Sequence, residues 1–216
     1  MSPMRQAIAA LMSDRALAVV RAADLPDVQG LCAALAEGGI SIVELTFTIS
    51  DARRHLATAV QASSATGARV GAGTVLSSEL ATMAIDAGAE FLVTPGIGRD
   101  AAEIVEIGHG AGAAVVLGAF TASEVLTALE LGADAVKIFP ARLAGPQHFA
   151  DLRGPFPGAR LLASGGVTAE NARAFLDAGA IAASAGTTVV SPRAVEQSDW
   201  GAITTSAREF RKACSE

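Results

Sequence analysis

Short runs of apolar residues recur along the chain, and each is followed by an alanine-rich stretch with helical spacing. Eight of these runs are strand candidates: Leu17–Val20, Ile40–Thr46, Arg69–Val75, Phe91–Thr94, Ala113–Gly118, Ala135–Phe139, Arg160–Ala163 and Ile181–Ala185. Strands that are apolar at nearly every position are typical of a parallel sheet whose two faces are both covered by helices. The pattern therefore predicts an α/β protein built from repeated strand–helix units.

The number and spacing of these units predict how the sheet closes. Eight units at intervals of roughly 20 to 25 residues predict a (β/α)8 TIM barrel. An open, doubly wound sheet is the alternative that the same alternation allows. The amphipathic stretch that follows Met1 predicts one more helix, at the N-terminus. No segment resembles a linker, so residues 1–216 are predicted to form one domain.

Capping residues predict several helix boundaries. Thr121, with Glu124 three residues later, has the spacing of a capping box. Ser77 and Ser198 are candidate N-caps, and the helix after Ser198 is expected to extend to about Cys214. Further helices are expected over Pro26–Glu37, from near Asp51 and from Thr168.

Composition and charge narrow the classes of partner and compartment. A hydrophobic fraction of 51% with 18% charged residues supports a packed core. A net charge of -6 without a basic cluster argues against nucleic acid or an anionic membrane as the main partner. No apolar run approaches the roughly 20 residues that span a bilayer. Cys32 and Cys214 have no metal-ligand spacing, so we expect a buried thiol and an exposed tail thiol in a reducing cytoplasm.

Lys137 stands out because it interrupts an apolar strand. The chain has only two lysines, and the other, Lys212, lies in the polar last helix. Alternation along the strand directs Lys137 into the barrel interior, between Ala135 and Phe139 on the same face. Loss of hydration there favours the neutral amine, which is the nucleophile that forms a Schiff base with a ketone. A lysine that is salt-bridged in the interior, or that reaches out at the strand end, is the structural alternative.

Glu44 is the predicted partner of this lysine. The same alternation directs Glu44 and Thr46 to one face of the second strand, opposite Val43 and Leu45. A carboxylate buried alone is highly unfavourable, and alternate strands of such a barrel contribute to a common interior layer. Strands two and six therefore let Glu44 and Lys137 meet. The pair can be a static ion bridge, or Glu44 can carry the protons that imine chemistry requires.

Two glycine turns follow the seventh and eighth strands and form the third candidate feature. One turn contains Ser164, Gly165 and Gly166, and the other contains Gly186 and Thr187. In TIM barrels the loops at these two places often form a phosphate site from backbone N–H groups. Glycines let the backbone approach the anion, and the Ser164 or Thr187 hydroxyl can add a donor. A simple tight turn is the alternative reading of each Gly pair.

Several motifs of the chain resemble those of a known family. They occur in the same order as in the family, and the resemblance covers about residues 10 to 210. The motifs are Glu44–Thr46, Gly71–Leu76, Thr94–Gly96, Lys137–Ala141 and Ser164–Val167. They are similar to those of the class I aldolases for 2-keto-3-deoxy-6-phosphogluconate (KDPG) and 4-hydroxy-2-oxoglutarate (KHG). The resemblance implies a cytoplasmic lyase of Entner–Doudoroff type carbohydrate metabolism, usually a homotrimer, without metal or other cofactor.

The same resemblance implies roles for individual residues. Lys137 would be the Schiff-base lysine and Glu44 the general acid and base. Thr74 and Pro95 would contact the pyruvate part of the substrate. The residues implied to hold phosphate are Gly165, Gly166, Gly186 and Thr187.

One position departs from the family pattern. Phosphogluconate members usually have an arginine two residues after the threonine of the Glu-x-Thr motif, where it binds the pyruvate carboxylate, and phosphogalactonate relatives tend to have asparagine. Thr48 occupies this place and has no charge. Arg21, at the end of the first strand, matches another arginine of many relatives and can take the anion instead. A surface arginine without a role in the site is the alternative.

The remaining candidates are weaker. His55, His109 and His148 lie apart without ligand spacing, so they are expected on the surface and no metal site is predicted. Trp200 is expected to pack the last helix against the barrel.

The predicted function is cleavage of a 2-keto-4-hydroxy acid into pyruvate and an aldehyde. Two other classes stay open: a phosphosugar isomerase or epimerase, which needs no interior amine, and a non-catalytic barrel that binds a phosphorylated metabolite.

Overall fold

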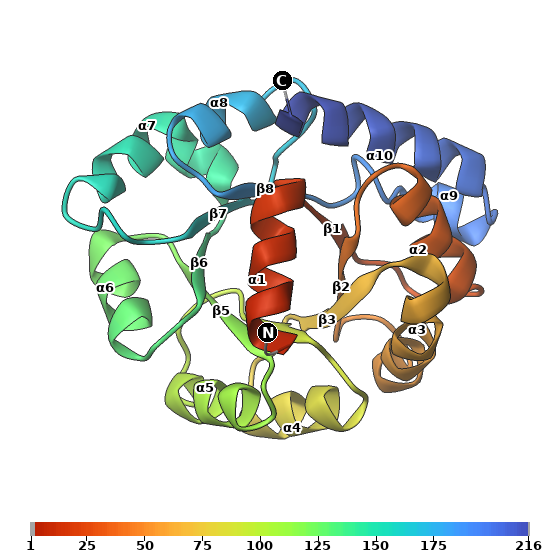
Figure 1. Cartoon of the computed structure of the whole chain (residues 1–216), viewed down its shortest axis with the longest axis horizontal. Coiled ribbons are helices and arrows are strands. Elements are labelled where there is room, and N and C mark those ends of the chain that lie inside the picture. The colour runs from red at the N-terminus through yellow and green to blue at the C-terminus, as the bar shows by residue number, and fades with distance from the viewer. Residues whose placement is uncertain (1–2, 216) are drawn as a thin grey trace.

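The computed structural model describes residues 3–215 and contains a closed barrel of parallel strands (Figure 1). Each strand pairs with the next in sequence, and β8 pairs with β1. The strands are β1 (Ala16–Val20), β2 (Ile42–Thr46), β3 (Arg69–Gly73), β4 (Phe91–Val93), β5 (Ala114–Ala119), β6 (Ala135–Ile138), β7 (Leu161–Ser164) and β8 (Ala182–Ala185). The predicted TIM barrel is confirmed and the open, doubly wound alternative is wrong.

Helices surround the barrel and cover its outer face (Figure 1). They are α2 (Val28–Glu37), α3 (Ala52–Thr66), α4 (Ser78–Asp86), α5 (Ala101–Gly110), α6 (Ala122–Glu130), α7 (Ala141–Arg153), α8 (Ala172–Asp177), α9 (Pro192–Glu196) and α10 (Trp200–Ser215). Between barrel and helices lies the larger apolar cluster, which contains Val136 and Ile138 of β6. Ala135 of the same strand belongs to a second cluster inside the barrel. The predicted alternation along this strand is therefore confirmed.

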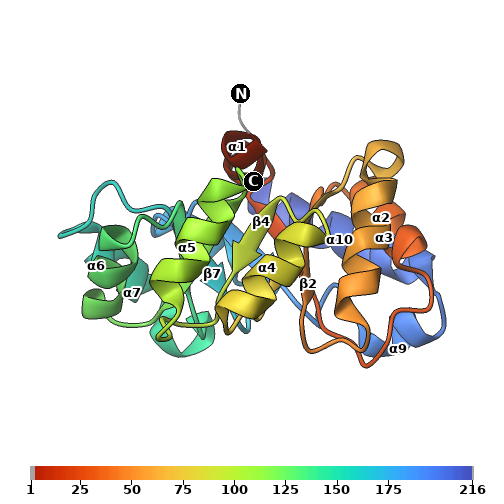
Figure 2. The ribbon, with the colours of Figure 1, turned by 90° about the horizontal axis from the view of Figure 1, so that it is seen from below.

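The predicted N-terminal helix, α1 (Pro3–Asp14), lies across one end of the barrel (Figures 1 and 2). Its buried residues Ala7, Ile8 and Leu11 belong to the interior cluster, together with residues near the starts of strands, such as Leu17 and Ile42. The helix thus closes the end of the barrel at which the strands begin. The opposite end, where the strands finish, is left for a binding site.

Two predicted helix starts are confirmed by their caps. The Ser77 side chain accepts a hydrogen bond from the Leu80 N–H, and Thr121 and Glu124 form the predicted capping box. The structure corrects two other predicted helix starts, those at Ser198 and Thr168. Ser198 has a positive φ of 51°, and the Ala202 N–H donates to the Asp199 carboxylate, so Asp199 performs the capping predicted for Ser198.

The region before the last helix also differs from its prediction. Thr168 does not begin α8, because the chain makes turns until Ala172 and the Asn171 side chain accepts from the Thr168 N–H. The short helix α9 (Pro192–Glu196) was not predicted. It begins with proline after Ser191, which caps it by accepting from the Ala194 N–H.

Three predictions about single side chains meet different outcomes. Cys214 is buried, not exposed, because it lies on the inner face of α10. Burial raises the pKa of the Cys214 thiol to about 11. Burial, together with the negative charge of Asp27, raises the pKa of the Cys32 thiol to about 12. His55 is also buried rather than on the surface, with its Nε2 3.2 Å from Asp24 Oδ1. Trp200 begins α10 and packs on the outer core as predicted.

Within residues 3–215, no helix is long and apolar enough to cross a membrane.

Candidate active site

Lys137 lies on the inward face of β6, where it is opposite Gly118 of β5 in the strand register. Only 6% of the residue is exposed, and its Nζ lies 5.6 Å from the centre of the Phe139 ring. That distance is within the range of a favourable cation–π contact. The sequence prediction of an interior lysine is confirmed.

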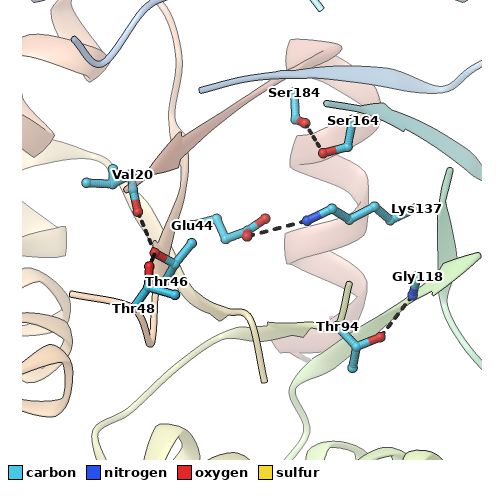
Figure 3. A network of polar contacts seen from close by, with 9 residues as sticks. All are labelled: Val20, Glu44, Thr46, Thr48, Thr94, Gly118, Lys137, Ser164 and Ser184. Carbon is cyan, nitrogen blue, oxygen red and sulfur yellow. Dashed lines mark hydrogen bonds and ion pairs between the residues drawn. The ribbon is translucent and has the colours of Figure 1, made fainter. Parts of the chain in front are cut away.

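Glu44 approaches this lysine from β2 (Figure 3). The Nζ of Lys137 is 3.6 Å from Oε1 of Glu44, and Glu44 is only 1% exposed. Gly73 of β3 makes room for the carboxylate, because a methyl group at that position would overlap the Glu44 side chain. Two residues far apart in the sequence thus meet in the barrel interior, as the alternation predicts.

The Glu44 carboxylate lacks hydrogen-bond donors. Within the described part of the chain, neither of its buried oxygens has a hydrogen-bond partner, and its distance to Lys137 exceeds a normal hydrogen bond. A buried carboxylate in a purely structural ion bridge usually has its oxygens satisfied by several donors. The described residues supply no such donors to Glu44, which distinguishes this pair from such an ion bridge.

Two hydroxyl groups, one at the end of β2 and one just after it, form a short hydrogen-bonded chain (Figure 3). Thr46 Oγ1 donates to the carbonyl oxygen of Val20 at 3.0 Å and lies 2.8 Å from Thr48 Oγ1. A hydroxyl has one hydrogen, and a carbonyl can only accept, so Thr48 is the donor to Thr46. Thr48 therefore presents lone pairs, and neither a charge nor a free donor, just after the end of β2.

A cavity of about 270 Å³ opens beside Lys137 along β6, β7, β8 and β1. Seven of the predicted site residues line it: Arg21, Lys137, Ser164, Gly165, Gly166, Gly186 and Thr187. Residues that line it without having been predicted as site residues are Val19, Phe139, Arg142, Val167, Ser184 and Thr188. The lysine and both glycine turns thus share one cavity.

The first glycine turn has a conformation that requires glycine. Gly165 and Gly166 have φ values of 90° and 80°, which side chains rarely adopt. A methyl group at position 165 would lie 2.8 Å from the Phe139 ring. Next to this turn, Ser184 Oγ donates to Ser164 Oγ at 2.7 Å, which leaves the Ser164 hydrogen free to donate to a ligand.

Three predicted site residues, Glu44, Thr74 and Pro95, do not line this cavity. Thr74 follows β3 with a φ of 55°, and Pro95 follows β4 next to Thr94, whose Oγ1 accepts from the Gly118 N–H at 2.9 Å. Gly118 lets the Pro95 backbone come close, because a side chain there would overlap it. Thr74 and Pro95 thus lie just after the ends of β3 and β4, whereas the cavity lies along the strands from β6 to β1.

Acidic side chains do not gather into a metal centre here. Among residues 3–215, no group of three or more His, Cys, Asp or Glu side chains is placed to hold a metal ion. The side chains that bring charge to the cavity are those of Lys137, Arg21 and Arg142. The cavity is therefore suited to an anionic ligand.

Comparison with known proteins agrees with this arrangement. The sequence profile of the family described as "KDPG and KHG aldolase" matches residues 8–206. The chain belongs to this aldolase family. It is 32% identical to a 2-dehydro-3-deoxy-phosphogluconate aldolase of Treponema pallidum over 196 residues, which are 90% of this chain and 91% of that one.

Other similar proteins are named for the galactonate isomer. A 2-dehydro-3-deoxy-6-phosphogalactonate aldolase of Escherichia coli is 41% identical over 120 residues, covering 55% of this chain and 57% of its own. A solved structure titled "Native KDPGal structure" superimposes with a TM-score of 0.83 at 32% identity, over 92% of this chain and 93% of that chain. The similarity to both kinds of relative supports an aldolase, and hence a lyase, but does not determine which sugar acid is the substrate.

Arg142 lines the cavity of this aldolase but was not among the predicted site residues, although its place in the sequence indicates its location. Arg142 follows the Lys137–Ala141 motif, at the start of the helix after β6. Residues just after a strand in a TIM barrel lie at the same end as the active site. Hydrophobic periodicity gives no reason to select an arginine in such a loop, so only its position after the strand could have indicated it.

Proposed function

We propose that the chain is a class I, Schiff-base aldolase that reversibly cleaves a 2-keto-4-hydroxy acid into pyruvate and an aldehyde. The substrate is a 2-keto-3-deoxy-6-phospho sugar acid or 4-hydroxy-2-oxoglutarate, and the aldehyde is glyceraldehyde 3-phosphate or glyoxylate. The observation that carries the proposal is the buried Lys137 amine, 3.6 Å from a Glu44 carboxylate without hydrogen-bond donors. Membership of the aldolase family supports the reaction class.

The first half of the reaction forms the iminium ion. The neutral Lys137 amine attacks C2 of the ketone, and the C2–N bond forms as the carbonyl electron pair moves to oxygen. Glu44, protonated, gives its proton to this oxygen directly or through water. The Glu44 carboxylate then takes a proton from the attached nitrogen and passes it to the resulting hydroxyl. The hydroxyl leaves as water, and the freed nitrogen lone pair forms the iminium double bond, with Glu44 left as a carboxylate.

The second half breaks the carbon–carbon bond. Glu44, now a carboxylate, takes the proton of the C4 hydroxyl, and the C3–C4 electron pair moves toward the iminium nitrogen, which becomes neutral. The aldehyde leaves and an enamine of pyruvate remains on Lys137. Glu44 returns its proton to C3, which regenerates an iminium ion. Water hydrolyses this ion to pyruvate and the free amine, and the proton that is released returns to the Glu44 carboxylate.

Residues around the lysine are proposed to hold the two ends of the substrate. Backbone N–H groups of Gly165, Gly166 and Gly186 are suited to a phosphate, with hydroxyl donors from Thr187 and Ser164. Thr74 and Pro95 are proposed to contact the pyruvate part. Arg21 lines the cavity and supplies the charge for the carboxylate, because Thr48 has neither a charge nor a free donor.

The test is pyruvate release from the purified protein. We expect cleavage of KDPG, its galactonate isomer or KHG, and loss of cleavage in the variants Lys137→Ala and Glu44→Gln. The matched control is Lys212→Arg, which changes the only other lysine and is expected to keep wild-type turnover. A Glu44→Gln variant with full turnover removes Glu44 from the mechanism.

The same measurement separates the alternatives. A phosphosugar isomerase or epimerase converts its substrate without releasing pyruvate, and a binding barrel leaves the keto acid intact. Absence of pyruvate from all three keto acids, with a folded protein, would overturn the proposal. The homotrimer and the cytoplasmic location that the family resemblance implies stay predictions, and light scattering of the purified protein tests the first.

A further inference from the structure

Arg142 is fixed beside the first glycine turn of the cavity. It belongs to the first turn of α7, and its backbone N–H donates to the carbonyl oxygen of Gly165 at 2.9 Å. Gly145 and Pro146 then interrupt the helix, so this first turn forms a separate short piece at the edge of the cavity. The position of Arg142 is thus tied to the glycine turn rather than to the rest of the helix.

The aliphatic part of Arg142 packs on Gly166. A methyl group at position 166 would lie 2.7 Å from Cβ and 2.8 Å from Cδ of Arg142, so glycine leaves room for the arginine stem. The stem therefore crosses the turn, and the side chain lines the same cavity as Lys137. The glycine turn and the Arg142 side chain are therefore in direct contact.

The guanidinium of Arg142 has no acidic partner. Elsewhere Arg69 pairs with Glu90 at 2.6 Å and Arg173 with Asp177 at 2.7 Å. Within residues 3–215, no carboxylate lies within ion-pair distance of Arg142, and its side chain makes no hydrogen bond. A positive charge that lines a cavity without a counter-ion is suited to an anionic ligand.

We propose that Arg142 binds the terminal phosphate of the substrate and makes this enzyme select phosphorylated keto acids over unphosphorylated ones. The proposal rests on the proposed aldolase function. Backbone N–H groups and hydroxyls of the glycine turns are neutral donors, whereas a guanidinium adds charge and two parallel hydrogen bonds to phosphate oxygens. This local charge outweighs the net charge of -6, because distant charges are screened within about 10 Å.

Selectivity is tested with Arg142→Gln, which keeps much of the stem but removes the charge. The measured quantity is the ratio of kcat/KM for the phosphorylated keto acid to kcat/KM for the same acid without phosphate. We expect this ratio to fall roughly 10- to 100-fold, as for a lost charge-assisted pair. The control is Arg53→Gln, an exposed arginine of α3 with the same change in charge. A fall smaller than about fivefold, or an equal fall for both substrates, overturns the proposal.

A second readout does not depend on catalysis. Calorimetric titration with inorganic phosphate is expected to give a weaker dissociation constant for Arg142→Gln than for wild type and Arg53→Gln. Equal phosphate affinities in the three proteins contradict the role of Arg142. Failure of the aldolase function itself is recognised separately, because the wild-type protein would then release no pyruvate from any keto acid while phosphate binding could still depend on Arg142.

Discussion

At the scale of single residues, the geometry of the site depends on the space that its glycines leave for neighbouring side chains. The sequence indicated Lys137 and Glu44, because charged residues in apolar strands are conspicuous and alternation directs both inward. It did not indicate that Gly73 provides the space for the Glu44 carboxylate. Nor did it indicate the missing hydrogen-bond donors around that carboxylate, since these depend on which side chains of other strands face it.

Gly73→Ala tests this residue-scale account. The added methyl group would overlap the Glu44 side chain and push the carboxylate away from Lys137. We expect kcat/KM for pyruvate release to fall on the order of 100-fold, as a misplaced catalytic group produces. The matched control is Gly158→Ala, because nothing lies within 4 Å of a methyl group there. Wild-type activity in Gly73→Ala would mean that the position of the carboxylate does not matter.

At the scale of elements, strands were predicted better than helix ends. Each of the predicted strands is present with its ends shifted by a few residues, because burial on both faces leaves a strong apolar signal. Helix starts depend on single hydrogen bonds, so Thr121 was recognised from its capping box, whereas Ser198 was chosen instead of Asp199. Two adjacent polar residues compete for such a cap, and only the backbone conformation decides between them.

The capping box of α6 makes a prediction about stability. Thr121→Ala removes the side chain that accepts from the Glu124 N–H, and the free energy of unfolding should fall by about 1 kcal/mol. Thr127→Ala is the control, since its hydroxyl donates to the Ser123 carbonyl within the same helix and performs no capping. Urea unfolding of both variants measures the difference. Equal free energies for the two would show that the cap contributes nothing.

At the scale of the whole molecule, the two ends of the barrel have different roles. Helix α1 closes the end where the strands begin (Figure 2). The cavity lies where they finish. The sequence predicted the barrel and the helix, but not where the helix lies, because an amphipathic segment can pack on any apolar surface. The arrangement separates residues that stabilise the barrel from those at the site.

Leu11→Ala tests this separation. Leu11 is 3% exposed and packs in the interior cluster, so its loss should lower the free energy of unfolding by about 2 to 5 kcal/mol. Met12→Ala, at a neighbouring position that is 47% exposed, should change it by less than about 0.5 kcal/mol. The kcat/KM of folded Leu11→Ala is expected to stay at the wild-type value. A large loss of kcat/KM in folded protein would show that the two ends are coupled.

The central claim is that the Lys137 amine forms a covalent imine with pyruvate. The direct measurement is reduction with borohydride in the presence of pyruvate, followed by peptide mass analysis. The account predicts one reduced pyruvate on the peptide that contains Lys137, and the same adduct in Lys212→Arg but not in Lys137→Ala. Absence of an adduct at Lys137 in a wild-type protein that cleaves keto acids would contradict the account.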